Sequence, residues 1–296
     1  MSEKFDIPFK SSFVPAVMEP GVKLKFSCHK GISCFNACCR NADIQLTPYD
    51  ILRLKDNLGL SATEFLKHHT VPYEMDKDGL PGIKLRTDND GACGFVTDEG
   101  CSVYQDRPTA CRYYPLGHMA MREAGSSEDE ARYFLIREDH CKGHDEDREI
   151  SVEDYRREQE VEVYDQINRE WLQLMLKKKS AGPSIGRPSD TSLQFFFMCS
   201  YDVDRLRRFV LSDSFKVSYD LDDSFYATME KEDQALMQFG TRLLKQVLFG
   251  EVTIPVKEGA VDKRVEERKE ILELRRKAEI ELHQQKKEQE MKDALS

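Results

Sequence analysis

The stretch CSVYQDRPTACRYYP, residues 101–115, decides the fold expected for the first half of this chain. Pro108 can open a short helix and Pro115 has to end it, because proline fits the first helical turn but breaks a helix interior. Cys111 then lies near a helix N-terminus, where the helix dipole favours a thiolate. We therefore expect a loop and short helix that present Cys101 and Cys111 as ligands.

Cysteines outside this stretch extend the same interpretation. The chain holds nine cysteines, and a reducing compartment keeps thiols free, so a set of this size needs a purpose other than disulfides. Cys199 follows the apolar run 195–198 and is expected in the hydrophobic core. The other eight lie in the first half and are the expected metal ligands: Cys28, Cys34, Cys38, Cys39, Cys93, Cys101, Cys111 and Cys141.

The spacing of these cysteines favours an iron–sulfur cluster over zinc. Structural zinc sites usually present paired knuckles with two to four residues between the cysteines, and no two cysteines here have two residues between them. A cluster of the 4Fe-4S type accepts irregular spacing, including the adjacent pair Cys38 and Cys39, because its ligands surround a larger body. Zn2+ is the alternative. One four-cysteine site with spare thiols and two four-cysteine sites both fit eight ligands, and either member of the adjacent pair can be a ligand.

These motifs resemble the YkgJ family of cysteine-cluster proteins, described as a zinc- or iron-chelating domain. The resemblance rests on Cys34-x3-Cys38-Cys39, on Cys93-Gly94-Phe95, and above all on residues 101–115 with their Arg-Pro-x2-Cys-Arg core. It covers roughly residues 26–141, and the tight Cys-x2-Cys spacing usual at the start of the family is stretched here. The family includes flagellin lysine methylases with an iron–sulfur cluster, so the resemblance implies a methyl-transfer or redox role besides metal binding.

Charged residues beside the cysteines have two interpretations. Arg107 and Arg112 flank Cys111, and we expect them to offset the negative charge of a thiolate-bound centre rather than pair with surface carboxylates. His29 and His140 each adjoin a cysteine and are the two histidines that merit testing as ligands. A single histidine near a loop is more often a solvated or supporting group than a ligand.

Local signals predict several elements. Thr47 and Ser61 are expected to cap two helices, each with an acidic residue three positions later. Residues 83–86 alternate like a strand and are expected to pair with 93–96 across a turn at 88–91. Ser151 should cap one long helix whose apolar positions recur as far as Leu174.

Together these signals predict an α+β fold: a small cysteine-rich metal-binding domain with short β-hairpins and helices, then a mainly α-helical region and a charged C-terminal helix. The expected segments are an N-terminal arm at 1–25, the cysteine-cluster domain at 26–150, a helix at 151–178, a linker at 179–190, a helical region at 191–256 and a charged tail at 257–296.

Composition limits the partners. The formal net charge is -10, and an acidic chain is a poor general partner for nucleic acid or an anionic membrane surface, since phosphates need a basic face. The chain shows no basic and apolar leader and no apolar run of bilayer length. We therefore expect a cytoplasmic protein with no nucleic-acid and no membrane partner. A protein partner could bind through the helical C-terminal half.

No familiar catalytic motif is present, neither a dinucleotide or phosphate loop, nor a zinc protease helix, nor a nucleophile elbow. Whether the chain is an enzyme is left open. Three functions fit: a metal-binding protein whose cluster serves redox or sensing, a protein-modifying enzyme similar to the flagellin lysine methylases, and a zinc-stapled interaction protein without catalysis.

Overall fold

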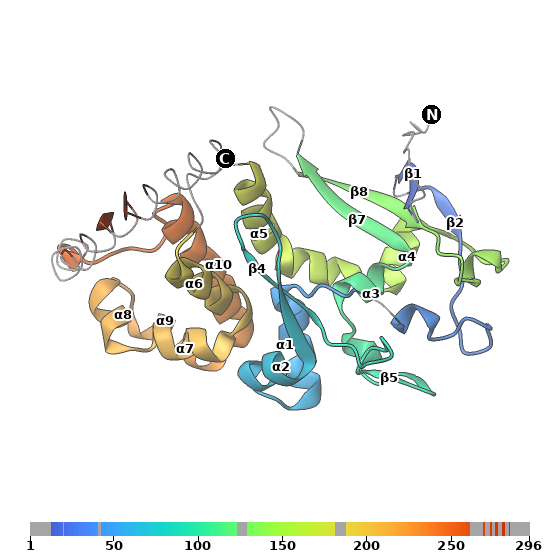
Figure 1. Cartoon of the computed structure of the whole chain (residues 1–296), viewed down its shortest axis with the longest axis horizontal. Coiled ribbons are helices and arrows are strands. Elements are labelled where there is room, and N and C mark those ends of the chain that lie inside the picture. Colours follow the sequence, from blue (N-terminus) through green and yellow to red (C-terminus); the bar gives the residue numbers. More distant parts are fainter. Residues whose placement is uncertain are drawn as a thin grey trace, which may run out of the picture.

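The fold combines helices with short antiparallel strand pairs, which confirms the α+β prediction (Figure 1). The computed structural model describes residues 13–19, 21–40, 43–122, 129–180 and 188–260, and single positions between 269 and 284. The strands lie in the first half of the described chain, and helices fill the second half. None of the described helices has the length and apolar character needed to cross a lipid bilayer.

A three-stranded sheet lies above the helices that follow the cysteine-rich segment (Figure 1). Its order is β1 (Phe13–Met18), β8 (Asp129–Ile136) and β7 (Leu116–Arg122), all antiparallel. A separate pair joins β2 (Lys23–Lys25) to β9 (Glu149–Ser151). The N-terminal arm pairs through β1 and β2 with distant strands that the sequence did not reveal.

The predicted pairing of 83–86 with 93–96 is wrong. Strand β4 (Pro81–Leu85) pairs instead with β3 (Thr70–Glu74), and Cys93 meets Thr87 only in an isolated bridge. The reason lies in the turn between β3 and β4. There the Asp76 carboxylate accepts hydrogen bonds from the backbone N–H groups of Asp78 and Leu80. Such a turn closes a hairpin locally. A small hairpin of β5 (Val96–Thr97) and β6 (Gly100–Cys101) follows.

Both expected helix caps in the first half are confirmed. Helix α1 (Pro48–Leu58) begins after Thr47 and helix α2 (Ala62–His69) after Ser61, each with a complete capping box. The helix expected between the two prolines is also present as α3 (Thr109–Tyr113).

The long helix expected after Ser151 is two helices. Ser151 caps α4 (Val152–Glu158), and α5 (Val161–Ser180) starts after a break at Glu160, whose φ is 55°. A left-handed backbone cannot continue a right-handed helix. The remaining described helices are α6 (Asp190–Tyr201), α7 (Val203–Val210), α8 (Asp213–Ser218), α9 (Asp223–Lys231) and α10 (Asp233–Phe249).

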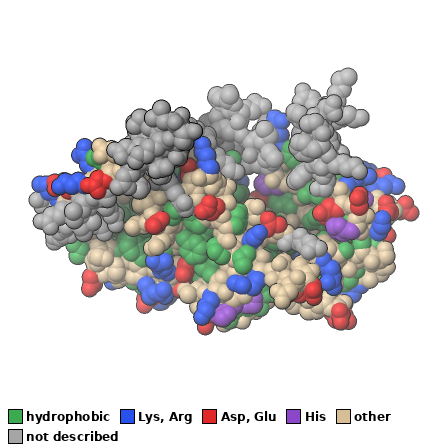
Figure 2. All heavy atoms as spheres, viewed as in Figure 1, with side chains coloured by type: hydrophobic (Ala, Val, Ile, Leu, Met, Phe, Trp, Pro, Cys, Tyr) green, Lys and Arg blue, Asp and Glu red, His purple; other side chains and the backbone are tan. Residues whose placement is uncertain are grey.

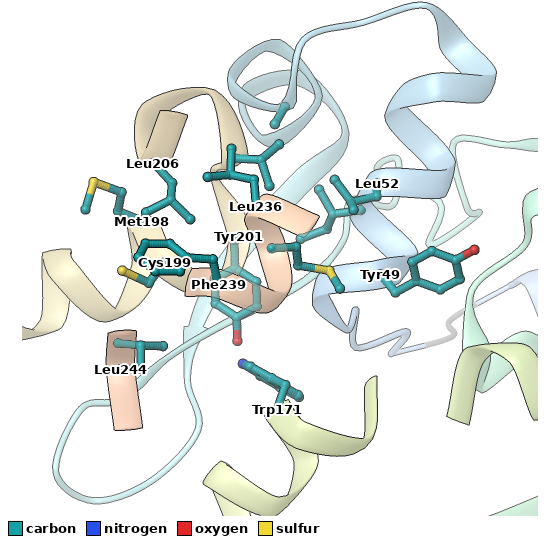
Figure 3. Close-up of a cluster of buried hydrophobic side chains, with 14 of the residues drawn as sticks. Tyr49, Leu52, Trp171, Met198, Cys199, Tyr201, Leu206, Leu236, Phe239 and Leu244 are labelled. Atoms are coloured by element: carbon teal, nitrogen blue, oxygen red, sulfur yellow. The ribbon is translucent and has the colours of Figure 1, made fainter. Parts of the chain in front are cut away.

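The larger hydrophobic core joins the two halves of the chain. Side chains of α1 and α2 pack in one cluster with those of α5, α6, α7 and α10, and Tyr49, Trp171 and Tyr201 lie within it (Figure 3). Cys199 is 1 % exposed in this core, as expected. Packing therefore continues across residue 150, and the segment boundaries remain a prediction. Of the linker expected at 179–190, residues 181–187 lie outside the described residues, while 179–180 end α5 and Asp190 begins α6. Most of the tail after 260 also lies outside the described residues.

A smaller core lies beneath the three-stranded sheet. It gathers buried side chains from β1, β2, α3, β7, β8, β9, α4 and α5, together with Phe26 from the loop after β2. Tyr113 and Tyr155 are among them. Cys141 packs against this smaller core, whereas Cys93 and Cys101 pack against the larger one. The cysteine-rich segments therefore lie where the two cores meet.

Candidate metal centre

One group of thiols comes from two loops far apart in sequence. Ser27 donates its backbone N–H to the carbonyl of Gly143, and the Lys142 N–H lies 3.1 Å from the Cys34 sulfur. A Cβ on Gly143 would stand 2.9 Å from the Ser27 carbonyl oxygen, so the two loops approach too closely for any other residue. This contact brings Cys28 and Cys34 beside Cys141.

A second group comes from the β5–β6 hairpin and α3. Cys101 lies in β6 opposite Val96, and the Val96 N–H in turn donates to the carbonyl of Cys93. Cys111 lies on α3 and is partly exposed, as are the other two. The hairpin therefore sets the spacing of Cys93 and Cys101, and the short helix adds the third thiol.

The segment 36–39 connects the two groups. Asn36 has a φ of 67° and donates its side-chain amide to the carbonyl of Thr97, which ties this turn to the hairpin. The Cys93 N–H donates to the carbonyl of Cys39 at 2.9 Å. Cys38, exposed at the surface, lies between the groups.

The pKa values of the thiols reflect this convergence. Partial burial of the sulfur, together with Cys38, Cys34 and Cys141, raises the pKa of Cys28 to about 11. Burial also raises the pKa of Cys111, with added repulsion from Cys93, Cys101, Asp50 and Cys38. The same Cys38 thiol acts on both groups, so the thiols form one continuous cluster. Cys111 lies in the first turn of α3, as expected, but without a metal its pKa is raised rather than lowered.

The thiol of Cys38 also has a raised pKa. A hydrogen bond to Cys39 is the main reason that its pKa is raised, followed by partial burial of the sulfur atom. Burial also raises the pKa of Cys93 and Cys101, and only Cys101 gains relief from the Arg107 guanidinium. Without a cation these thiols are therefore neutral at pH 7, and a bound metal would displace their protons.

The donor set fits a thiophilic metal in its chemistry. Soft sulfur ligands select zinc, copper(I) and iron–sulfur clusters. Within the described part of the chain, however, no three His, Cys, Asp or Glu side chains stand close enough to hold one metal ion. Thiol ligands lose their protons on binding, so metal binding and local folding would be coupled.

Arg112 does not serve the cluster as expected. It is 2 % exposed, and its guanidinium donates to the backbone carbonyls of Gln105, Arg107 and Gln159. It also lies over the Tyr164 ring, 4.3 Å from the centroid. All these partners are structural, so Arg112 fixes the segment between Cys101 and Cys111 onto the junction of α4 and α5.

Arg107 acts on one of the cysteines, as expected. Its guanidinium lowers the pKa of Cys101 against the effect of burial, although it also donates to the Tyr104 carbonyl and the Gln159 side chain. The two histidines beside cysteines are engaged elsewhere. His29 contacts Glu146 through Nε2 and the Gly31 N–H through Nδ1, and the Nε2 of His140 lies 3.6 Å from Glu138.

Two buried carboxylates, Asp50 and Asp106, support this site in roles that the sequence did not reveal. Asp106 accepts hydrogen bonds from Arg53 and Asn57 of α1, and Asp50 accepts bonds from Thr109 at the start of α3. Asp50 was visible in the sequence as the acidic member of the Thr47 capping box. Its second task, to hold α3, depends on a contact across 59 positions that no local pattern shows.

These features define a class of protein: a thiol-rich metal-binding domain fused to a helical region. Residues 27–142 match the CxxCxxCC family model, described as "Putative zinc- or iron-chelating domain". The match includes all eight expected ligands and confirms the resemblance drawn from the sequence, over less than half of the chain. No curated protein and no solved structure matches the chain.

Proposed function

We propose that the cysteine cluster holds an iron–sulfur cluster of the 4Fe-4S type with a redox or sensing role in the cytoplasm. The observation that carries the proposal is the position of Cys38, whose thiol acts on both cysteine groups. An extended set of thiols that Cys38 links in this way suits a larger body better than the compact tetrahedron of a single zinc ion.

The ligand set of this proposal follows the two groups. Cys93, Cys101 and Cys111 form one side of the cluster, and Cys38, which acts on Cys101 and Cys111, is the candidate for a fourth ligand. Cys28, Cys34 and Cys141 form the other side, and Cys28 is exposed. A centre shared in this way is reachable from solvent, as electron transfer or sensing requires.

Spectroscopy of matched variants tests the proposal. Protein purified without oxygen should be brown and should bleach on reduction with dithionite. Cys111→Ser should lose this absorption, because it removes a ligand from the partly buried side, whereas Cys199→Ser should keep it. Colourless wild-type protein, or equal loss in both variants, would contradict the proposal.

A zinc-stapled interaction protein is the second candidate, and the meeting of the two cores at the cysteines favours it. A single zinc ion there would hold the cores together. A partner could use the face in Figure 2 where hydrophobic side chains gather in the region of α6 and β4. A groove of about 390 Å³ lies there, lined by Tyr73, Pro81, Leu193 and Phe197 among others.

A protein-methylating role is the third candidate. It rests on the family resemblance and requires a site for a methyl-donor cosubstrate. Calorimetric titration of metal-loaded protein with S-adenosylmethionine tests it: saturable binding would support the role, and no heat of binding would remove it.

A further inference from the structure

Asp50 is a buried carboxylate without a cation. It is 0 % exposed, and its two oxygens accept three hydrogen bonds, from the Thr47 N–H and from the N–H and hydroxyl of Thr109 at 2.7 to 2.8 Å. Three donors aimed at one carboxyl group favour its ionised form. Burial raises the pKa of Asp50, and these hydrogen bonds oppose the rise.

A second buried carboxylate, Asp106, has a cationic partner. Asp106 is also buried, but Arg53 and Asn57 bind it, so its charge is neutralised. Asp50 forms no ion pair with a Lys, Arg or His among the described residues. A buried charge is costly unless an opposite charge compensates it.

A metal bound at the expected centre would supply such a charge. Thr109 opens α3, and Cys111 follows two residues later. The two hydrogen bonds from Thr109 therefore place the Asp50 carboxylate at the helix turn that carries Cys111. A metal cation bound to Cys111 would attract both the thiolate and this carboxylate.

We propose that Asp50 is a positioning residue of the metal centre: it anchors the helix that presents Cys111 and places a fixed negative charge beside the bound cation. This inference rests on the proposed metal binding but not on the identity of the metal. Groups that orient metal ligands from behind typically contribute 10- to 100-fold to affinity.

The test is a titration of metal-free protein with zinc in competition with a chromophoric chelator. Asp50→Asn should bind zinc roughly 10- to 100-fold more weakly than wild type. Two matched controls should bind like wild type: Asp202→Asn removes another buried carboxylate, which caps α7, and Thr47→Ala removes the hydroxyl that caps α1 but keeps Asp50. Circular dichroism of each metal-free variant checks that the helices are retained.

The zinc titration has several outcomes that would contradict the inference. Asp50→Asn with wild-type affinity would overturn the inference, as would an equal loss in Thr47→Ala, which would indicate general loosening of α1. Wild-type protein that binds no zinc would overturn the proposed metal binding and this inference together. If Asp50→Asn does not fold, Thr109→Val replaces it, since it removes one hydrogen bond to Asp50 and keeps the charge. A chelator should then strip zinc from Thr109→Val faster than from wild type, and an unchanged rate would overturn the inference.

Discussion

Replacing Arg112 by lysine separates two roles that the sequence could not distinguish. If the residue only offset the charge of the thiolates, lysine would serve as well. The structure instead shows a planar guanidinium that donates to three backbone carbonyls and to the Tyr164 hydroxyl. A lysine ammonium is a point donor and cannot reach this spread of acceptors.

The expected loss of stability follows from the backbone carbonyls that would lose their donors in Arg112→Lys. Arg112 is 2 % exposed, so water does not replace the lost bonds. With two carbonyls unsatisfied, and 1–3 kcal/mol for each buried unsatisfied group, the free energy of unfolding should fall by about 3 kcal/mol.

Urea unfolding of the metal-loaded protein, followed by circular dichroism, measures this loss. Arg157→Lys is the matched control, because Arg157 lies on α4 with its side chain 60 % exposed and should change stability by less than about 0.5 kcal/mol. An Arg112→Lys protein as stable as this control would refute the structural role.

Three further predictions concern the metal and the fold. Cys199→Ala should keep the metal, because its thiol lies in the apolar core, whereas Cys111→Ala should lose it; equal loss of metal by elemental analysis would show that the ligand set spans both halves. Gly143→Ala should separate the loops of Ser27 and Gly143, since its Cβ would stand 2.6 Å from a Phe26 ring carbon. Its metal content should therefore fall, and a metal content equal to that of wild type would contradict this prediction. Removal of residues 257–296 should leave metal content and melting temperature unchanged, and a large drop in either would show that the tail is part of the fold.

Local chemistry explains what could be predicted from the sequence. The caps at Thr47 and Ser61 were recognisable because a capping box is complete within four residues. The eight candidate ligands were recognisable by their clustering, and Cys199 by its apolar neighbours. The short helix α3 was recognisable because two prolines bound it.

Long-range contacts explain what could not be predicted. The break at Glu160 interrupts an apolar pattern that continues on both sides, so periodicity alone could not locate it. The strand β3 precedes its partner across a turn held by the side chain of Asp76. The division of the thiols into two groups joined by Cys38 depends on loops more than 100 residues apart, such as those of Cys34 and Lys142.

Iron and acid-labile sulfide in protein purified without oxygen test the central claim most directly. The proposed cluster predicts iron and sulfide in equal amounts, about four of each per chain, with little zinc. Zinc in stoichiometric amount, with no sulfide, would contradict the cluster and favour the stapled interaction protein.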